Sequence, residues 1–354
     1  MCRAERAERG RFSRHYAGLI VGATLGGLWP SVGWPAPADP IPAVDLSPTR
    51  QILYQWTDRA PLEAVPAGSV TPSFRASYFA AVSDQQRGGA SVAIDVEGAR
   101  FDLGAAWAPV EGVSVEVALP LLVYYDGVLD SLVDAIDRAV GTPSPQRKDR
   151  GQNVYSFLVE SPDGTRFEPD SGHLGLGDLA LGGRYRLLEQ DLGGWTPDVS
   201  VSGALELPTG DSSLAHGNGS VDFGAEVEAG RSLGDFRLSV AVGLVVPGGL
   251  PDGLDGFDTR VSVSALGAVG YTLADAWGLI AQVDYRQAPY QGSSLDVLAS
   301  DSSELTVGLR WEPRGGALGV DVGFVEGLVN GASPDFSVVS SLRYRFSLDR
   351  SASP

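Results

Sequence analysis

Histidines are the first candidates for acid–base chemistry, and only His173 and His216 lie beyond the first 38 residues of the 354-residue chain. The segment HGNGS (216–220) places His216, Asn218 and Ser220 within five residues, a combination found in lipid hydrolases. A catalytic triad needs a nucleophile, a base and an orienting group within mutual hydrogen-bond reach. Here all three residues fall in one glycine-rich loop without a separate strand to orient them. We therefore predict a polar loop, and we assign no catalytic residue.

Carboxylates and glycines form two further patterns. Asp252, Asp255 and Asp258 recur at every third position of PGGLPDGLDGFD (247–258), but this spacing matches no EF-hand loop, so a solvated turn is predicted. The glycines of GLGDLALGG (175–183) precede no helical pattern, and they suit a curved strand better than a phosphate-binding loop. No group of side chains has the spacing of metal ligands, so we expect neither a metal nor a cofactor.

Composition excludes several classes of protein. The net charge is −18 and the only lysine is Lys148, whereas a protein that binds nucleic acid needs clustered positive charge. The mean hydropathy is +0.01 and no run of 18 apolar residues occurs, which argues against a bundle of membrane helices.

The N-terminus has the three regions of a signal peptide. Five arginines precede the apolar stretch Tyr16–Trp29, and Ala36-Pro37-Ala38 offers small residues at the cleavage positions. We predict cleavage after residue 38. Removal of residues 1–38 also removes Cys2, the only cysteine, so the mature chain cannot rely on disulfides.

Long stretches of strict alternation dominate the rest of the chain. In RFDLGAAWAPVEGVSVEVALPLLVYY (100–125), apolar residues occupy every second position on both sides of a turn at 109–112. This pattern predicts two antiparallel strands with one apolar face, far longer than the roughly 5–6 residues of an ordinary strand. At Gly98 the apolar positions change parity, which predicts a β-bulge or a tight hairpin.

The alternation continues to the C-terminus and predicts twelve strands. Their ranges are 74–82, 92–107, 113–125, 179–187, 199–207, 221–227, 236–244, 261–271, 277–285, 305–311, 318–324 and 336–346.

Connections between these strands fall into two alternating classes. Short turns follow every second strand, at 109–112, 189–195, 232–235, 272–277 and 313–316. Longer polar loops follow the other strands, including the first, and the longest runs from about 126 to 172. An even number of strands with short turns at one end and long loops at the other is typical of an outer-membrane β-barrel. We therefore predict an all-β fold, a 12-stranded antiparallel transmembrane barrel.

Such a barrel assigns the two faces of each strand to different media. The apolar parity would face lipid, with an aromatic girdle near the short turns that comprises Trp107, Trp195, Trp277 and Trp311. The other parity would face the lumen. The charged candidates there are Arg184, Arg186, Glu206, Glu226, Glu228, Arg237, Asp284, Arg286 and Arg310.

One segment of the longest loop has helical spacing instead. Leu129, Leu132, Val133, Ile136 and Val140 recur with aspartates on the other side. We predict a short helix over 128–140 in an extracellular loop. It packs either on the loop itself or in the barrel mouth, where it would restrict passage.

Several stretches resemble, in the same order, an uncharacterised family of Gram-negative outer-membrane proteins that is known as a domain of unknown function. The stretches are LPLLVYYDGVLDSLVDAIDRAVGTP, HLGLGDLALGGRYRLLE, ALELPTGD, GSVDFGAEVEAGRSLG, QAPYQGSSLD and SPDFSVVSSLRYRF. The chain also resembles outer-membrane proteins encoded with aromatic (phenol) degradation pathways, which are described as transporters. The resemblance implies a barrel in the outer membrane, but it assigns no functional residue.

We therefore expect a signal peptide (1–38), a periplasmic lead-in (39–71), the barrel (72–346) and a tail (347–354). The expected partners are outer-membrane lipid, lipopolysaccharide, a small-molecule solute and the barrel-assembly machinery, which recognises an aromatic-ended last strand such as Leu342–Phe346. The predicted function is passive passage or binding of small solutes. The alternatives are a structural or adhesive barrel with a blocked lumen and, less favoured, a lipid hydrolase.

Overall fold

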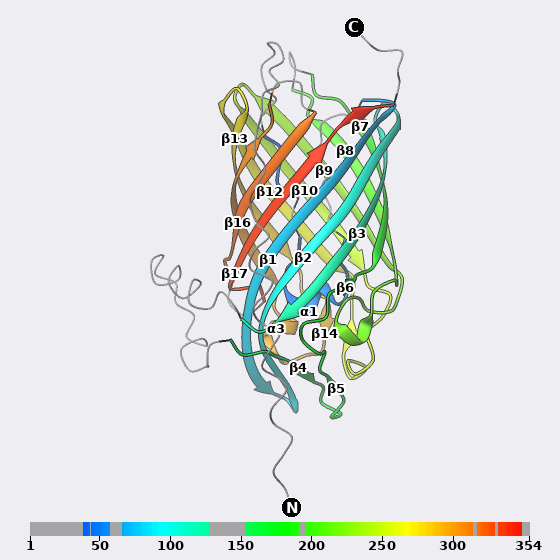
Figure 1. Cartoon of the computed structure of the whole chain (residues 1–354), viewed down its shortest axis with the longest axis vertical. Helices are drawn as coiled ribbons and strands as arrows, with labels where there is room; N and C mark the ends of the chain where they lie inside the picture. The colour runs from blue at the N-terminus through cyan, green and yellow to red at the C-terminus, as the bar shows by residue number, and fades with distance from the viewer. Residues whose placement is uncertain are drawn as a thin grey trace, which may run out of the picture. The chain divides into compact units, whose positions relative to one another are not determined.

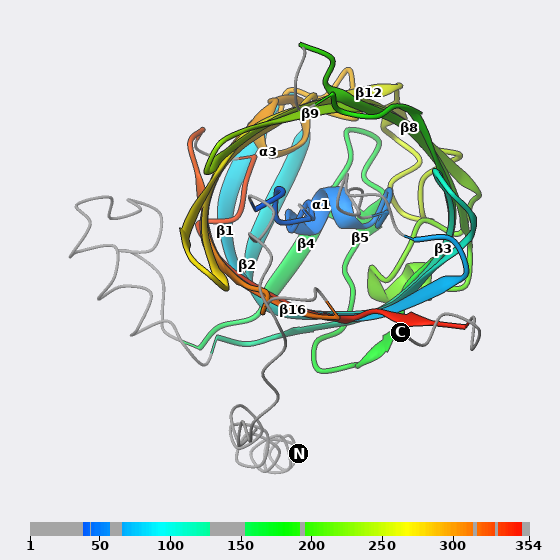
Figure 2. The same ribbon diagram turned by 90° about the horizontal axis from the view of Figure 1, so that it is seen from above.

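Twelve antiparallel strands form one closed β-barrel (Figures 1 and 2). The computed structural model describes residues 38–42, 44–56, 66–127, 153–191, 195–313, 317–329 and 332–348. The strands pair in sequence order, and the last, β17, pairs back onto β1. They are β1 Ser69–Arg87, β2 Ala90–Val110, β3 Val113–Tyr125, β7 Leu179–Leu188, β8 Asp198–Leu207, β9 Asp222–Leu233, β10 Phe236–Val246, β12 Ser262–Ala274, β13 Trp277–Arg286, β15 Ser302–Trp311, β16 Leu318–Gly327 and β17 Phe336–Tyr344. All twelve predicted strands are confirmed.

The chain also forms several short strands and helices besides the twelve barrel strands. The short strands are β4 Ser156–Glu160, β5 Arg166–Phe167, β6 Gly175–Leu176, β11 Asp258–Thr259, β14 Tyr290–Gln291 and β18 Phe346–Ser347. The helices are α1 Pro48–Gln51, α3 Asp296–Ala299 and the 3₁₀ turn Ser212–Leu214. None of the helices in the described ranges is long and apolar enough to cross a membrane. The helix predicted over 128–140 lies outside the described residues.

The two ends of the barrel differ in their connections. At one end, here called the turn end, two residues suffice to join β2 to β3, β9 to β10 and β12 to β13. Gly112 and Gly234 adopt positive φ angles of 74° and 62° in the first two of these turns, a conformation that favours glycine. Ser69 of β1 pairs with Ser347 of β18, so both ends of the barrel sequence also lie at the turn end. The opposite end is called the loop end.

The outer face of the barrel is apolar. In β10 exposed and buried residues alternate along the whole strand, and the exposed ones are Phe236, Leu238, Val240, Val242, Leu244 and Val246. The buried parity carries Arg237 and Ser239 instead. Exposure of apolar surface to water costs about 25 cal/mol per Å². A continuous apolar outside around a polar inside therefore suits a hydrocarbon surrounding and not water.

The hairpin of β1 and β2 extends beyond its neighbours at the loop end (Figure 1). β17 accompanies β1 only as far as Ala80, and β3 accompanies β2 only as far as Glu97. The hairpin closes at Gly88-Gly89, where both φ angles are positive. The long polar loop predicted after the first strand was therefore wrong, because the strands continue through that segment.

The bulge or hairpin predicted at Gly98 was also wrong. β2 runs without interruption from Ala90 to Val110, and its register with β1 is continuous past Gly98. The inward parity is the same on both sides of this residue. From Gly98 towards the turn end the first inward side chains are the polar Arg100 and Asp102. From Gly98 towards the loop end they are Val96, Ile94 and Val92, each 1–2% exposed. The apolar residues change parity because the surroundings change along the strand.

An apolar core fills the loop end. Phe79, Tyr124, Phe157 and Phe167 lie in one chain of edge-on ring contacts with centroids 5.7–6.0 Å apart. Strand β4 adds Phe157 and Val159 by pairing with the extended part of β2. Because strand side chains alternate, the polar side of this part of β2 points away from the core.

The N-terminal segment lies inside the barrel. Residues 38–42 and 44–56, here called the interior segment, are buried almost throughout, and α1 crosses the barrel interior in Figure 2. The periplasmic lead-in predicted over 39–71 thus differs from the structure, in which β1 starts at Ser69. The difference has a clear cause, because an irregular segment has no periodicity from which burial can be inferred.

Candidate functional site

Inner-face glycines make room for the interior segment. A Cβ atom added at Gly270 would overlap the carbonyl oxygen of Ala38, and one at Gly308 would overlap the side chain of Ile41. At the far end of the segment, a Cβ atom at Gly224 would overlap the indole of Trp56. The barrel wall is therefore thinned along the route that the segment follows.

Polar side chains of the wall hold the start of this segment. Arg237 forms a buried ion pair with Asp39. The side-chain amide of Gln282 pairs with the backbone of Ile41, accepting its N–H at 2.9 Å and donating to its carbonyl at 3.0 Å. Arg310 Nη2 also donates to the carbonyl of Pro40 at 3.3 Å. The wall thus satisfies backbone groups that burial would otherwise leave unpaired.

The helix α1 is anchored at the loop end. Arg50, 1% exposed, donates to the Ser302 hydroxyl at 2.9 Å and to the Ser300 carbonyl at 2.6 Å. Tyr290 donates its hydroxyl hydrogen to the Thr49 carbonyl at 2.8 Å. These bonds fix a four-residue helix that is too short to be stable on its own.

Five residues of the barrel and its loops surround the tripeptide Leu53-Tyr54-Gln55. We call them the Gln55 site: Arg100, Asp178, Glu206, His216 and Asn218. Each is at most 3% exposed. They come from β2, from the short break between β6 and β7, from the end of β8, and from the loop between β8 and β9.

The Gln55 site forms hydrogen bonds with both the backbone and the side chain of Gln55. The Gln55 N–H donates to both oxygens of Glu206 at 2.9 and 3.0 Å, and its carbonyl accepts from Arg100 Nη2 at 2.5 Å. The Gln55 side-chain oxygen accepts from the Asp178 N–H at 2.9 Å, and its amide nitrogen donates to the His216 carbonyl at 2.7 Å. Asn218 Nδ2 donates to the Leu53 carbonyl at 2.9 Å.

Burial shifts the ionisation of the two loop residues of this site. Removal from water raises the pKa of the Asp178 carboxyl, although the backbone N–H of Gly210 partly opposes the shift. Removal from water also lowers the pKa of the His216 imidazole, which stacks on the ring of Tyr124. Burial therefore shifts the ionisation of both groups towards the neutral form.

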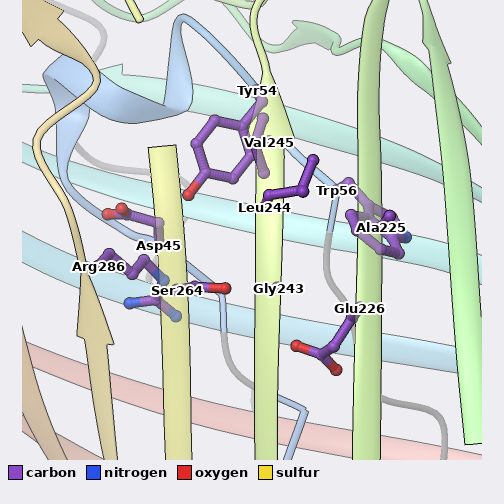
Figure 3. A pocket seen from close by; sticks show the side chains of 10 residues that line it. All are labelled: Asp45, Tyr54, Trp56, Ala225, Glu226, Gly243, Leu244, Val245, Ser264 and Arg286. Carbon is purple, nitrogen blue, oxygen red and sulfur yellow. The ribbon is translucent and has the colours of Figure 1, made fainter. Parts of the chain in front are cut away.

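A small cavity remains beside the interior segment (Figure 3). Its volume is about 30 Å³, room for about two water molecules. Asp45, Tyr54 and Trp56 of the segment face Glu226 and Arg286 of the wall across this space. Along the described ranges, the interior segment thus runs through the lumen from Ala38, near the turn end, to Gln55, near the loop end.

The nine charged residues predicted to face the lumen all lie on the strand parity opposite the exposed apolar residues. Most of them pair with each other or with residues that the sequence analysis did not select. Arg184 contacts Glu228 at 2.7 Å, Arg286 contacts Glu304 at 2.9 Å, and Arg310 contacts Asp321 at 2.6 Å. Arg186 lies near the turn end, 3.3 Å from Glu111. Glu226 and Asp284 are also buried.

Sequence reasoning missed part of this interior. Glu304 and Asp321 share the inward parity of the predicted residues, so a stricter use of alternation would have found them. Arg100, by contrast, lies close to the change of parity at Gly98, where the pattern was misread. Gln282 carries no charge, and no signal in the sequence indicates that it binds the backbone of residue 41.

The four tryptophans predicted to form a girdle lie close to the turn end. Trp277 and Trp311 are direct partners across β13 and β15, and Trp107 is near the end of β2. Trp195 lies in the connection from β7 to β8, is 89% exposed, and has the Arg231 guanidinium 5.3 Å from its ring centre.

The described residues do not assemble the hydrolase triad considered above. His216 is 1% exposed, and its Nδ1 atom has no hydrogen-bond partner among them. Asn218 accepts the backbone N–H of Ser220 and donates to Asp222. Likewise, no group of three or more potential ligands in the described ranges could hold a metal ion.

Comparisons with known proteins agree with this fold. A family model described as "Protein of unknown function (DUF3187)" matches residues 59–346, and no curated protein matches the sequence. The COG4313 outer membrane channel from Pseudomonas putida F1 is similar in structure, with a TM-score of 0.56 and 13% identity over 82% of this chain and 100% of that chain. At this identity the likeness concerns the fold, which is that of an outer-membrane channel barrel.

Two further solved structures are similar over most of their length. The KdgM porin has a TM-score of 0.39 and 9% identity over 78% of this chain and 99% of that chain. The CymD monoaromatic hydrocarbon channel has a TM-score of 0.36 and 14% identity over 80% of this chain and 90% of that chain.

Proposed function

The chain belongs to the DUF3187 family of proteins of unknown function, and on this premise we propose that it is a gated outer-membrane channel for small solutes. The barrel spans the outer membrane, and the interior segment is its plug. Passage of solute then requires the segment to leave the lumen.

One observation carries this proposal. A separate stretch of chain lies inside the lumen, and the wall along its route carries glycines such as Gly224, Gly270 and Gly308. A barrel that is closed for good can fill its interior with side chains of its own strands. Here glycines of the wall leave space that the segment fills, so withdrawal of the segment would leave a path.

The position of the barrel in the membrane follows from its two ends. Short turns face the periplasm and long loops face the outside in outer-membrane barrels, so the Gln55 site lies near the extracellular mouth. The apolar outer face contacts lipid, with lipopolysaccharide around the loop end. The last barrel strand ends at Tyr344 and Phe346 follows in β18, an aromatic ending that suits recognition by the barrel-assembly machinery.

The test is conductance in planar lipid bilayers. We expect the mature chain to be closed most of the time, and a variant that lacks residues 39–56 to show discrete channel steps. A second variant, Gln282→Leu, removes both hydrogen bonds to Ile41 and should raise the frequency of opening. A deletion variant that folds, as judged by heat-dependent mobility on gels, but stays silent would overturn the proposal.

A structural or adhesive barrel with a blocked lumen is the second candidate. The apolar core at the loop end favours it, because Phe79, Phe157 and Phe167 pack there in a chain of aromatic contacts through Tyr124. The same recordings separate the two candidates, since this one expects silence from the deletion variant too.

A further inference from the structure

We propose that the Gln55 site is a binding site for short peptides or amino-acid amides, in which Leu53-Tyr54-Gln55 is a tethered occupant. This inference rests on the proposed channel function and names a class of solute for it. A free ligand would compete with the plug for the same groups.

The first support is the match between the site and a peptide backbone. Each residue of a peptide offers one backbone N–H and one backbone carbonyl. At Gln55, Glu206 accepts a hydrogen bond from the N–H and Arg100 donates one to the carbonyl. The carbonyl two residues earlier accepts from Asn218. A carboxyl group, a guanidinium and an amide from separate parts of the barrel therefore converge on one short stretch of backbone.

The second support is the selectivity of the site for a neutral amide. The Asp178 N–H donates to the side-chain oxygen of Gln55, and the His216 carbonyl accepts from its nitrogen. A carboxylate side chain in the same place would bring its negative charge against that carbonyl oxygen. A glutamine or asparagine amide satisfies both partners at once.

The third support is the shape of the wall at this point. A Cβ atom at Gly177 would overlap the side-chain oxygen of Gln55, so this glycine leaves room for the occupant. Within the described structure, Arg100 Nη1, Asp178 Oδ2 and His216 Nδ1 also lack hydrogen-bond partners. The tethered segment thus leaves three buried polar atoms of the site without a hydrogen bond, although buried polar groups are nearly always paired.

Binding of a free ligand would be coupled to opening. Withdrawal of the plug leaves the buried Glu206 without the Gln55 N–H and the buried Arg100 without the Gln55 carbonyl, although Arg100 keeps its ion pair with Asp102. A buried polar group that loses a hydrogen-bond partner is costly, so this step is unfavourable on its own. A ligand that refills the site replaces those bonds and therefore shifts the equilibrium towards the open state.

The experiment uses the mature protein in detergent and the probe N-acetyl-Leu-Tyr-Gln-amide. Its dissociation constant is measured by calorimetry. Deletion of residues 39–56 removes the competitor, so the peptide should bind this variant most tightly. Gln55→Leu removes two hydrogen bonds of the tether and should tighten peptide binding by about tenfold relative to the unaltered protein.

Gln51→Leu is the matched control. It is the same substitution four residues away, and the Gln51 amide donates to Leu46 within the segment itself. This variant should bind the peptide as the unaltered protein does. Glu206→Leu should abolish binding, and if it does not fold, Asn218→Ala should weaken binding at the Leu53 carbonyl. A probe with norleucine in place of glutamine should bind at least tenfold more weakly.

Three results would overturn the inference: no binding to the deletion variant, equal affinities in the Gln55→Leu and Gln51→Leu variants, or equal affinity for the norleucine probe. The two proposals can fail separately. A deletion variant that conducts but binds no peptide removes the inference and leaves the channel. A deletion variant that binds peptide but stays silent in bilayers removes the channel and leaves the site.

Discussion

The strand β2 lies in two different surroundings on either side of Gly98. Towards the turn end, Leu103 points outward and is 48% exposed, while Asp102 on the opposite parity is buried. Towards the loop end, Ile94 points inward and is 1% exposed. The backbone keeps its parity throughout. The comparison shows that alternation fixes which residues share a face, whereas the medium on each side decides which face is apolar.

The same contrast divides the interior. Towards the turn end the inner face is a network of paired charges, whereas towards the loop end an apolar core that resembles a soluble domain lies beside the polar Gln55 site. The two regions should therefore respond differently to the same kind of substitution.

The largest loss of stability is expected when a residue of the charge network is substituted. Asp321 is fully buried and accepts hydrogen bonds from Arg310 and Arg343 at 2.6 and 2.9 Å. Asp321→Ala leaves two guanidinium groups without this partner, which should lower the free energy of unfolding by about 3–5 kcal/mol. Urea titration in lipid vesicles measures the change. Asp252→Ala, in an exposed turn, is the control, and equal effects of the two substitutions would contradict the network.

The lipid-facing surface comes next. Val240 lies in the middle of β10 with 57% of its surface exposed. Val240→Arg places a charge against hydrocarbon and should lower the free energy of unfolding by about 2–4 kcal/mol. Val261→Arg, one residue before β12 at the loop end, should cost only about 0–1 kcal/mol. If both variants lose the same stability in vesicles, the apolar outside does not face lipid.

A smaller effect is expected where the two regions meet. Gly98 gives space to the ring of Phe79, and an added Cβ would overlap it. Gly98→Ala should therefore lower the free energy of unfolding by about 1–3 kcal/mol, the usual range for overpacking. Gly267→Ala is the matched control, because nothing lies within 4 Å of its added Cβ. Similar losses in both variants would mean that the rings do not press on this strand.

Much of the barrel was predictable because strands repeat with a period of two. The strands, their order and the short turns follow from this repeat, and so does the inward parity of Arg237 and Arg310. The site was less predictable. The segment around Gln55 has no period, and its partners come from positions up to 165 residues later in the chain, as the hydrogen bond from Asn218 to Leu53 shows. Only tertiary packing brings such groups together.

The smallest effect tests the loop end through pH. Burial lowers the pKa of His216, with Asp211 opposing the shift and His173 adding to it. The unfolded chain therefore binds a proton before the folded chain does. The contribution of the neutral imidazole to stability is present above about pH 6.5 and is lost as the pH falls below that value. Acid should thus loosen the loop over 208–220.

Asp178 acts in the opposite direction. Its pKa is raised in the folded state, so the folded chain binds this proton first and gains stability as the pH falls through the raised pKa. In a His216→Gln variant the contribution of His216 to the pH dependence of stability is lost, and that of Asp178 remains. Amide hydrogen exchange of peptides over 208–220, corrected for the intrinsic rate, should rise between pH 7.5 and 5.5 in the unaltered protein. In the variant it should stay level or fall. An equal rise in both proteins would show that His216 does not couple the loop end to pH, so its burial in the apolar core would have no energetic consequence there.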